Sequence, residues 1–265
     1  MKKKITEIIS SYIKEYESRD DIHTVWGHPL VGFADAHDPY ILNLKNIVNP
    51  EHELPCDVLE DASIVIAYFV PFTKELAQTN SLDGYISSEE WALAYEETNA
   101  MLGKINEHVI KKLRELGYHA DISKESATFD QNKLISRWSH RHFARAAGLG
   151  TFGLNNMLIT KTGCCGRYST IVTNLDVQAD ALLKEEYCLY KKNGTCGVCV
   201  KHCPSHALTF DGFDRYKCYD VCKKNAEIYT EFGSSYTDES LENPNSIGSE
   251  VCGKCVVNAP CTFWH

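Results

Sequence analysis

Cysteine is the residue type whose number and spacing most clearly predict chemistry in this chain. Twelve cysteines occur among 265 residues, and nine of them lie between Cys188 and Cys261. Residues 196–204 read CGVCVKHCP, which places two thiols on one tight turn and ends in the Cys-Pro pair typical of a ferredoxin cluster loop. Residues 252–261 read CGKCVVNAPC and open in the same way. This pattern predicts thiolates that bind iron–sulfur clusters.

Eight of these cysteines can be divided between two clusters. In ferredoxins with two clusters, the last cysteine of one motif binds the cluster of the other motif. The same exchange gives two sets of four, as two [4Fe–4S] cubes require: a first set of Cys188, Cys196, Cys199 and Cys261, and a second set of Cys203, Cys218, Cys252 and Cys255. Cys222 is left over and could replace Cys218. The alternative is one zinc ion bound by the two Cys-x-x-Cys pairs, which leaves the other cysteines of this stretch unexplained.

A basic run that leads into a glycine-rich segment forms the second candidate site. Arg137, Arg141 and Arg145 recur at every fourth residue, so a helix would present them on one face. In an acidic chain such a stripe predicts an anion site, for example for a phosphate; a solvated face paired with surface carboxylates is the alternative. The candidate cofactor-binding residues are Arg137, His140, Arg141, Gly148, Gly150 and Gly153. The three glycines spell a dinucleotide-binding pattern, but that pattern follows a strand and opens a helix, the reverse of the order expected here.

Three cysteines lie before the cysteine-rich stretch. Cys164 and Cys165 are adjacent, so on an extended chain their side chains point apart and cannot easily bind the same ion. They are redox thiols, an extra ligand near the active site, or buried inert thiols. Cys56 has no predicted role. The sequence alone identifies no catalytic residue.

The spacing of apolar residues predicts a mixed α/β or α+β core that positions these sites. Helices are expected over residues 5–16, 89–116 and 133–147. Strands are expected over residues 30–34, 63–70, 118–122, 157–160 and 169–175. After residue 188 the periodicity weakens, and residues 234–250 are expected to form an exposed loop. These patterns predict an α/β core domain over residues 1–180 and a loop-rich, ferredoxin-like domain with two [4Fe–4S] clusters over residues 181–265.

Charge and hydropathy exclude several classes of protein. The net charge of −9 disfavours a general binder of nucleic-acid backbones, because such proteins are usually basic. The start of the chain lacks the apolar segment of a signal peptide, and no apolar run is long enough to span a membrane. Clustered thiols in such a chain predict metal binding in a reducing compartment, and so a cytoplasmic location.

Three parts of the sequence resemble the epoxyqueuosine reductases, cobalamin-dependent iron–sulfur enzymes related to reductive dehalogenases. They are residues 30–34 (LVGFA), residues 142–160 with the Ala-Gly-Leu-Gly segment, and the paired cysteine motifs with residues 214–218 (DRYKC) between them. The resemblance implies a nitroreductase-like core that binds cobalamin beside one cluster, and reduction of epoxyqueuosine in tRNA. Leu154 stands where the family has a lysine. The stretch expected to carry the family's catalytic aspartate reads LISRW over residues 134–138, and the nearest upstream acid is Asp130, out of register.

Two functions of different classes follow from these patterns. The first is a reductase in which two [4Fe–4S] clusters pass single electrons to a corrinoid or a substrate in the core domain. Its partners would be an electron donor such as ferredoxin or flavodoxin and a small-molecule or tRNA-borne substrate. The second is a ferredoxin-like electron carrier without catalytic activity that docks on a partner enzyme. A zinc-bound nucleic-acid module is a third hypothesis, disfavoured by the net charge and by the Cys-Pro ending.

Overall fold

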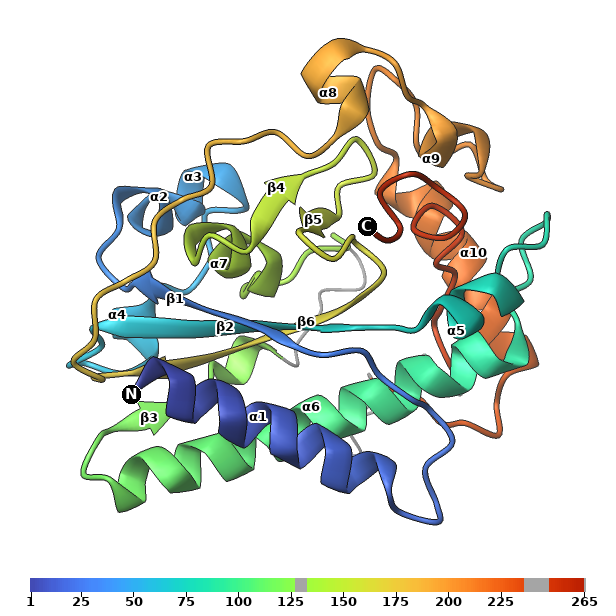
Figure 1. Cartoon of the computed structure of the whole chain (residues 1–265). Helices are drawn as coiled ribbons and strands as arrows, with labels where there is room; N and C mark the ends of the chain where they lie inside the picture. Colours follow the sequence, from blue (N-terminus) through green and yellow to red (C-terminus); the bar gives the residue numbers. More distant parts are fainter. Residues whose placement is uncertain (127–132, 236–247, 265) are drawn as a thin grey trace.

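A four-stranded antiparallel sheet forms the centre of the computed structural model, which describes residues 1–126, 133–235 and 248–264 (Figure 1). The strand order is β1 (Leu30–Asp35), β2 (Ile64–Pro71), β6 (Gly166–Thr173) and β3 (Ala120–Asp121). Every residue of β2 is buried, as its continuous apolar run predicts for a strand covered on both faces. The mixed α+β fold expected from the sequence is therefore confirmed.

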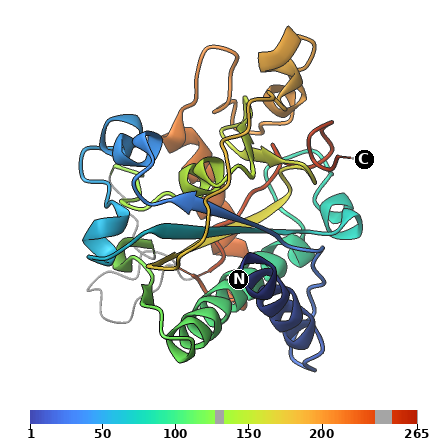
Figure 2. The same ribbon diagram turned by 60° about the vertical axis from the view of Figure 1, so that its left-hand side comes forward.

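Successive side chains of β2 enter two different cores, because neighbouring residues on a strand point to opposite faces. Ile66 and Tyr68 pack with α1 (Lys2–Glu17) and α6 (Glu89–Glu115) on one face. Val65 and Phe69 pack with α7 (His140–Ala146) on the other face. Figures 1 and 2 show the two long helices together below the sheet and α7 above it.

The long helix α6 begins and ends close to the predicted positions. The Ser88 hydroxyl caps its first turn by accepting a hydrogen bond from the Trp91 backbone N–H at 3.1 Å. Its buried face carries Met101, Ile105 and Val109, at the three- and four-residue spacing of an amphipathic helix. This face packs on α1 and on the sheet, and so holds the central strands in place.

Short elements connect these layers. The β4–β5 hairpin (Gly150–Phe152 and Leu158–Thr160) follows α7 directly and lies above the sheet. The remaining short elements are α2 (Pro39–Leu42), α3 (Leu44–Ile47), α4 (Pro55–Val58), α5 (Lys74–Thr79), the 3₁₀ turn η1 (Lys124–Ser126), α8 (Leu189–Asn193) and α9 (Val198–Lys201). The helix α10 (Arg215–Ile228) is longer and carries two cysteines.

Two expectations about secondary structure were wrong, and one helix was missed. The helix expected over residues 133–147 begins only at His140, because Leu134 has a left-handed backbone (φ 52°) and Trp138 turns into the core. The helix α10 was not predicted, since its apolar periodicity is weak. The loop expected over residues 234–250 is not exposed at its end, because residues 248–250 are buried; residues 236–247 lie outside the described residues, as does Asp130.

The cysteine-rich part of the chain packs directly on the sheet and on α6. Residues 174–188 form an irregular segment that contains the predicted boundary at residue 181 and runs along β1, where the Asp180 carboxylate pairs with Lys2 at 2.7 Å. Farther on, the Lys254 ammonium donates hydrogen bonds to the carbonyl oxygens of Asn80 and Leu82. Val256 and Val257 enter the same buried cluster as α1 and α6. In the described residues, no helix is both long and apolar enough to cross a membrane.

Candidate functional site

The four thiols of the first predicted set line one cavity. Cys188, Cys196, Cys199 and Cys261 all contribute to its wall, together with apolar side chains that include Tyr190 and Trp264. The structure thus brings together residues that are more than seventy positions apart in the sequence. Their role as ligands remains a prediction, but their arrangement around one cavity fits a bound [4Fe–4S] cube, which needs a thiolate on each of its irons.

Two short helices aim the first three of these thiols at the cavity. Cys188 immediately precedes α8, which ends at Gly194 in the left-handed conformation (φ 75°) and lets the chain turn back. Cys199 lies in α9, and this helix begins directly after Gly197. A side chain at Gly197 would collide with the ring of Phe210, so the turn between Cys196 and Cys199 packs closely against that aromatic ring.

The second predicted set gathers beside the first. Cys203, Cys218 and Cys255 pack with Cys199 in one small buried cluster. Burial raises the pKa of Cys252 to about 11, and burial together with the neighbouring thiols of Cys252 and Cys218 raises the pKa of Cys255. Such thiols stay protonated until a bound metal displaces the proton. The structure thus brings three members of the second set together, with Cys252 near them, and their role as ligands stays a prediction.

Cys222 lies one helical turn after Cys218 on α10, and its thiol is hydrogen-bonded to the Cys218 thiol. Both thiols also lie near Cys252, so either of them is placed to complete the second set. Among the described residues, no three Cys, His, Asp or Glu side chains converge as a site for a single metal ion.

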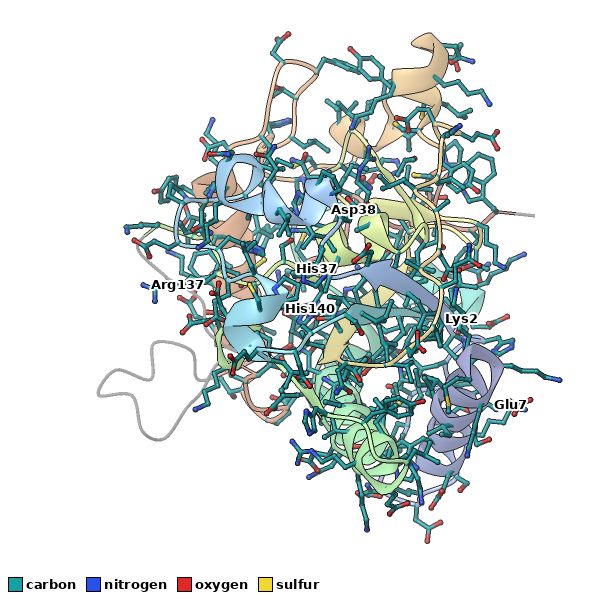
Figure 3. All side chains as sticks on the ribbon, turned by 90° about the vertical axis from the view of Figure 1, so that its left-hand side faces the viewer. Lys2, Glu7, His37, Asp38, Arg137 and His140 are labelled. Carbon is teal, nitrogen blue, oxygen red and sulfur yellow. The ribbon has the colours of Figure 1, made fainter. Side chains whose placement is uncertain are left out.

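The basic stripe expected before the glycine segment is not continuous. Arg137, labelled in Figure 3, precedes α7 instead of lying on it. Its guanidinium pairs with Glu51 at 2.9 Å. Arg141 donates a hydrogen bond to the Asn156 carbonyl oxygen at 2.6 Å. Arg145 lies over the ring of Tyr40, 5.4 Å from its centroid. The three arginines therefore serve three separate contacts, and the structure does not bring them together around one anion.

Neutral, aromatic groups line the buried face of α7. The Nδ1 atom of His140 lies 2.8 Å from the Thr170 hydroxyl, which also accepts a hydrogen bond from the Trp138 indole. His142 packs between the rings of Tyr40 and Phe152. Burial, reinforced by nearby arginines, lowers the pKa of His140 and that of His142 to about 4, so both imidazoles are uncharged at neutral pH.

The three predicted cofactor-binding glycines allow close packing of backbone. Gly148 has φ +70°, and a side chain there would overlap the Ala181 carbonyl oxygen. A side chain on Gly150 would overlap the Ile159 carbonyl across the β4–β5 hairpin. At Gly153 it would lie 2.6 Å from the Asn155 side-chain oxygen. A helix precedes these glycines and a strand follows them, as the sequence indicates, which does not suit a dinucleotide-binding motif.

The adjacent cysteines Cys164 and Cys165 are both buried, on the segment that leads into β6. The Cys164 sulfur lies 3.9 Å from the sulfur of Cys261, the last member of the first set. Sequence reasoning missed this proximity, because no periodicity links residues so far apart. Cys56 is exposed on α4, far from the thiol sets in sequence, and its role stays unassigned.

Comparisons with known proteins identify relatives of one kind. No family model matches the chain. A curated epoxyqueuosine reductase of Leadbetterella byssophila is 36% identical over 93 residues, which are 34% of this chain and 29% of that protein. Another, of Cellulophaga algicola, is 25% identical over 227 residues, which are 79% of this chain and 65% of that protein. The chain therefore spans less than two thirds of the length of these relatives.

Solved structures show the same likeness in fold. Epoxyqueuosine reductase from Bacillus subtilis superposes with a TM-score of 0.52 at 16% identity, over 95% of this chain and 64% of that chain. An epoxyqueuosine reductase bound to an epoxyqueuosine-modified tRNA stem loop superposes with a TM-score of 0.53 at 18% identity, over 96% of this chain and 64% of that chain. A catabolic reductive dehalogenase superposes with a TM-score of 0.50 at 18% identity, over 71% of this chain and 26% of that chain. The resemblance predicted from the sequence is confirmed.

Proposed function

We propose that this protein is an iron–sulfur reductase of the epoxyqueuosine reductase kind, which passes single electrons from two [4Fe–4S] clusters to its core. The observation that carries the proposal is the convergence of the first thiol set on a cavity whose opposite wall is the core itself. Leu154, Asn155 and Ile159 of the β4–β5 hairpin form that wall. A cluster in the cavity would therefore lie in contact with the glycine segment.

Leu154 of the β4–β5 hairpin lies next to both thiol sets, on the proposed path of the electrons. Leu154 lies in the wall of the first cavity and also packs against the buried cluster that holds Cys203, Cys218 and Cys255. Its backbone N–H lies 3.4 Å from the Cys188 sulfur and donates to it, a contact that stabilises a thiolate ligand. An apolar side chain where the family has a lysine keeps water away from the space between the two thiol sets.

A bound cobalamin has weaker support from the described residues. The resemblance places it beside one cluster, where it would supply a metal centre that accepts electrons one at a time. However, two of the glycines expected to line its site are packed against backbone carbonyls and the third against side chains, and the arginines are engaged in other contacts. The proposal therefore assigns the final acceptor as a corrinoid or the substrate, and no step depends on the corrinoid.

The relatives' names suggest the substrate. They are reductases of epoxyqueuosine, and one solved relative holds a tRNA stem loop that carries this base. We extend the tRNA-borne substrate to this chain as part of the proposal. No aspartate occupies residues 134–138, so the two protons that leave with the epoxide oxygen as water, when two electrons reduce the epoxide, would have to come from other donors.

We propose that the electron donor docks on the segment over residues 188–206. This segment carries Lys191, Lys192 and Lys201 and has no Asp or Glu of its own, although the whole chain has a net charge of −9 and Lys192 pairs with Glu185, just before the segment, at 3.3 Å. The exposed ring of Phe210 packs beside it on Tyr190. A basic surface with an exposed aromatic centre fits an acidic one-electron carrier such as ferredoxin or flavodoxin. Lys201→Glu should slow cluster reduction by the carrier about tenfold at low salt, with Lys3→Glu on α1 as the control.

The test of the proposed function begins with anaerobic purification, reconstitution and measurement of iron and sulfide. About eight irons per chain are expected for two cubes, and about four or fewer would contradict the proposal. Reduced protein is then incubated with epoxyqueuosine-containing tRNA, and the nucleosides are analysed for queuosine. Visible spectra with and without added cobalamin test the corrinoid. Intact clusters without substrate turnover or cobalamin binding would favour the electron carrier.

A further inference from the structure

A fifth thiol lies beside the first set of four. The sulfur atoms of Cys164 and Cys261 are 3.9 Å apart, and Cys164 is fully buried. Cys164 comes from the segment that leads into β6, whereas Cys261 follows the second Cys-x-x-Cys pair. Neither residue is drawn into a disulfide, since both are free cysteines.

Backbone contacts fix this pairing. The Cys164 N–H donates a hydrogen bond to the Cys261 carbonyl oxygen at 2.9 Å, and the Cys165 N–H donates to the Thr262 carbonyl oxygen at 3.4 Å. Gly163 has φ +104°, and a side chain there would overlap Thr262. The two segments therefore lie against each other along several residues. The closeness of the two sulfurs follows from the path of the backbone and not only from side-chain rotamers.

The Cys164 thiol donates a hydrogen bond to the Cys261 sulfur, and the distance between the two sulfurs also limits how the pair could bind iron. Two sulfur ligands bound to one tetrahedral metal, each at ~2.3 Å, lie ~3.8 Å apart. In a [4Fe–4S] cube each iron binds three sulfides and leaves one position for a thiolate. Cys164 and Cys261 are too close to serve different corners of the cube. They could bind the same iron, but only one at a time.

We propose that Cys164 is an alternate ligand for the iron that Cys261 is predicted to bind, so that either thiolate can complete the first cluster. The inference rests on the proposed function, because it requires a cluster in the first cavity. The Asn155 side-chain amide holds this arrangement: it lies 3.9 Å from the Cys164 sulfur and donates to the Cys255 carbonyl oxygen at 3.2 Å. Asn155 also lies in the cavity wall, so Cys164 is directly behind that wall.

The second thiol set shows the same arrangement. Cys222 is hydrogen-bonded to Cys218 one turn away on α10. Each set of four thus has one extra thiol in contact with one of its members. Cys165, the neighbour of Cys164, is also buried, but among the described residues its thiol makes no hydrogen bond to another thiol. This difference makes Cys165 a matched control for Cys164.

The test compares Cys261→Ala, Cys164→Ala, the double variant and the Cys165→Ala control, each reconstituted anaerobically. Alanine is used because a serine oxygen could itself bind iron. Wild type, the control and both single variants should retain about eight irons per chain, while the double variant should fall to about four. Circular dichroism confirms that each variant is folded. If Cys261→Ala alone falls to about four irons, as the double variant does, the inference is overturned.

A second variant covers the case in which Cys261→Ala does not fold. Cys261→Ser is then reconstituted with ⁵⁷Fe and measured by Mössbauer spectroscopy, which separates an iron with an oxygen ligand from one with sulfur ligands only. Sulfur-only irons support Cys164 as the ligand, and an oxygen-bound iron overturns the inference. A wild-type protein with about four irons or fewer would instead contradict the two-cluster proposal, so the two failures are distinguishable.

Discussion

Gly163→Ala should release the first cluster without removing any thiol. Gly163 has φ +104°, in the region that residues with a side chain avoid at a cost of ~1–2 kcal/mol. The new methyl group would also lie closer than 3.0 Å to the Thr262 backbone, which cannot rotate away. Forcing a group into a packed site costs a further ~1–3 kcal/mol, or displaces the neighbour. The strain falls on the backbone that leads into Cys164 as well as on the segment that carries Cys261, so neither of the two alternate thiols keeps its position at the iron.

Gly117→Ala provides the matched control. Gly117 follows α6 with φ +86°, but no atom lies within 4 Å of the position of the added methyl group. It should therefore show only the cost of the left-handed backbone, a fall in the unfolding temperature of about 2–8 °C at about 2–4 °C per kcal/mol. Gly163→Ala should fall further and retain about four irons per chain after reconstitution instead of about eight. Equal iron content in the two variants would refute the reasoning that Gly163 positions Cys261.

Three further substitutions have expected outcomes. His142→Phe should make the protein less sensitive to acid. The pKa of His142 in the folded protein is about 4, below the ordinary 6.5, so wild type loses at most about 3 kcal/mol of stability as the pH falls from 6.5 to 4. Thermal unfolding at several pH values measures this loss in both proteins. Lys254→Met should cost about 2–4 kcal/mol and weaken iron retention, because the carbonyls of Asn80 and Leu82 lose their buried donor; unchanged urea unfolding would contradict this. Ser88→Ala removes the cap of α6 and should cost about 1 kcal/mol in the same unfolding assay.

Much of the core fold could be predicted because its elements have simple periodicities. The apolar run that became β2 and the long amphipathic face of α6 are properties of single segments, and both are confirmed. The helix before the glycine segment was predicted too long, because Arg137 continues the four-residue spacing of Arg141 and Arg145 although it lies before the helix. Its true start depends on Trp138, which leaves the helix to pack in the core and donate a hydrogen bond to Thr170.

The candidate site was predictable where motif spacing sets the geometry. The Cys-x-x-Cys turns and the exchange of the last cysteine indicated which four thiols would meet, and the structure brings the first set to one cavity. The contact of Cys164 with Cys261 could not be predicted in this way. It depends on how a late segment of the chain packs against the start of β6, which is a tertiary contact without a local signal. The ion pair of Arg137 with Glu51 is likewise a tertiary contact without a local signal in the sequence.

The cavity between Cys188 and Cys261 also has a consequence for unfolding. A cluster bound there would be a cross-link that closes a loop of more than seventy residues. Closing a loop of that length lowers the entropy of the unfolded chain by an amount worth about 4 kcal/mol at room temperature. Loss of the cluster to oxygen would remove this constraint from the cysteine-rich third, whereas the residues of the sheet stay joined by their own strand pairing. Oxidative damage should therefore first become visible as protease cleavage after residue 188, before any loss of the central sheet.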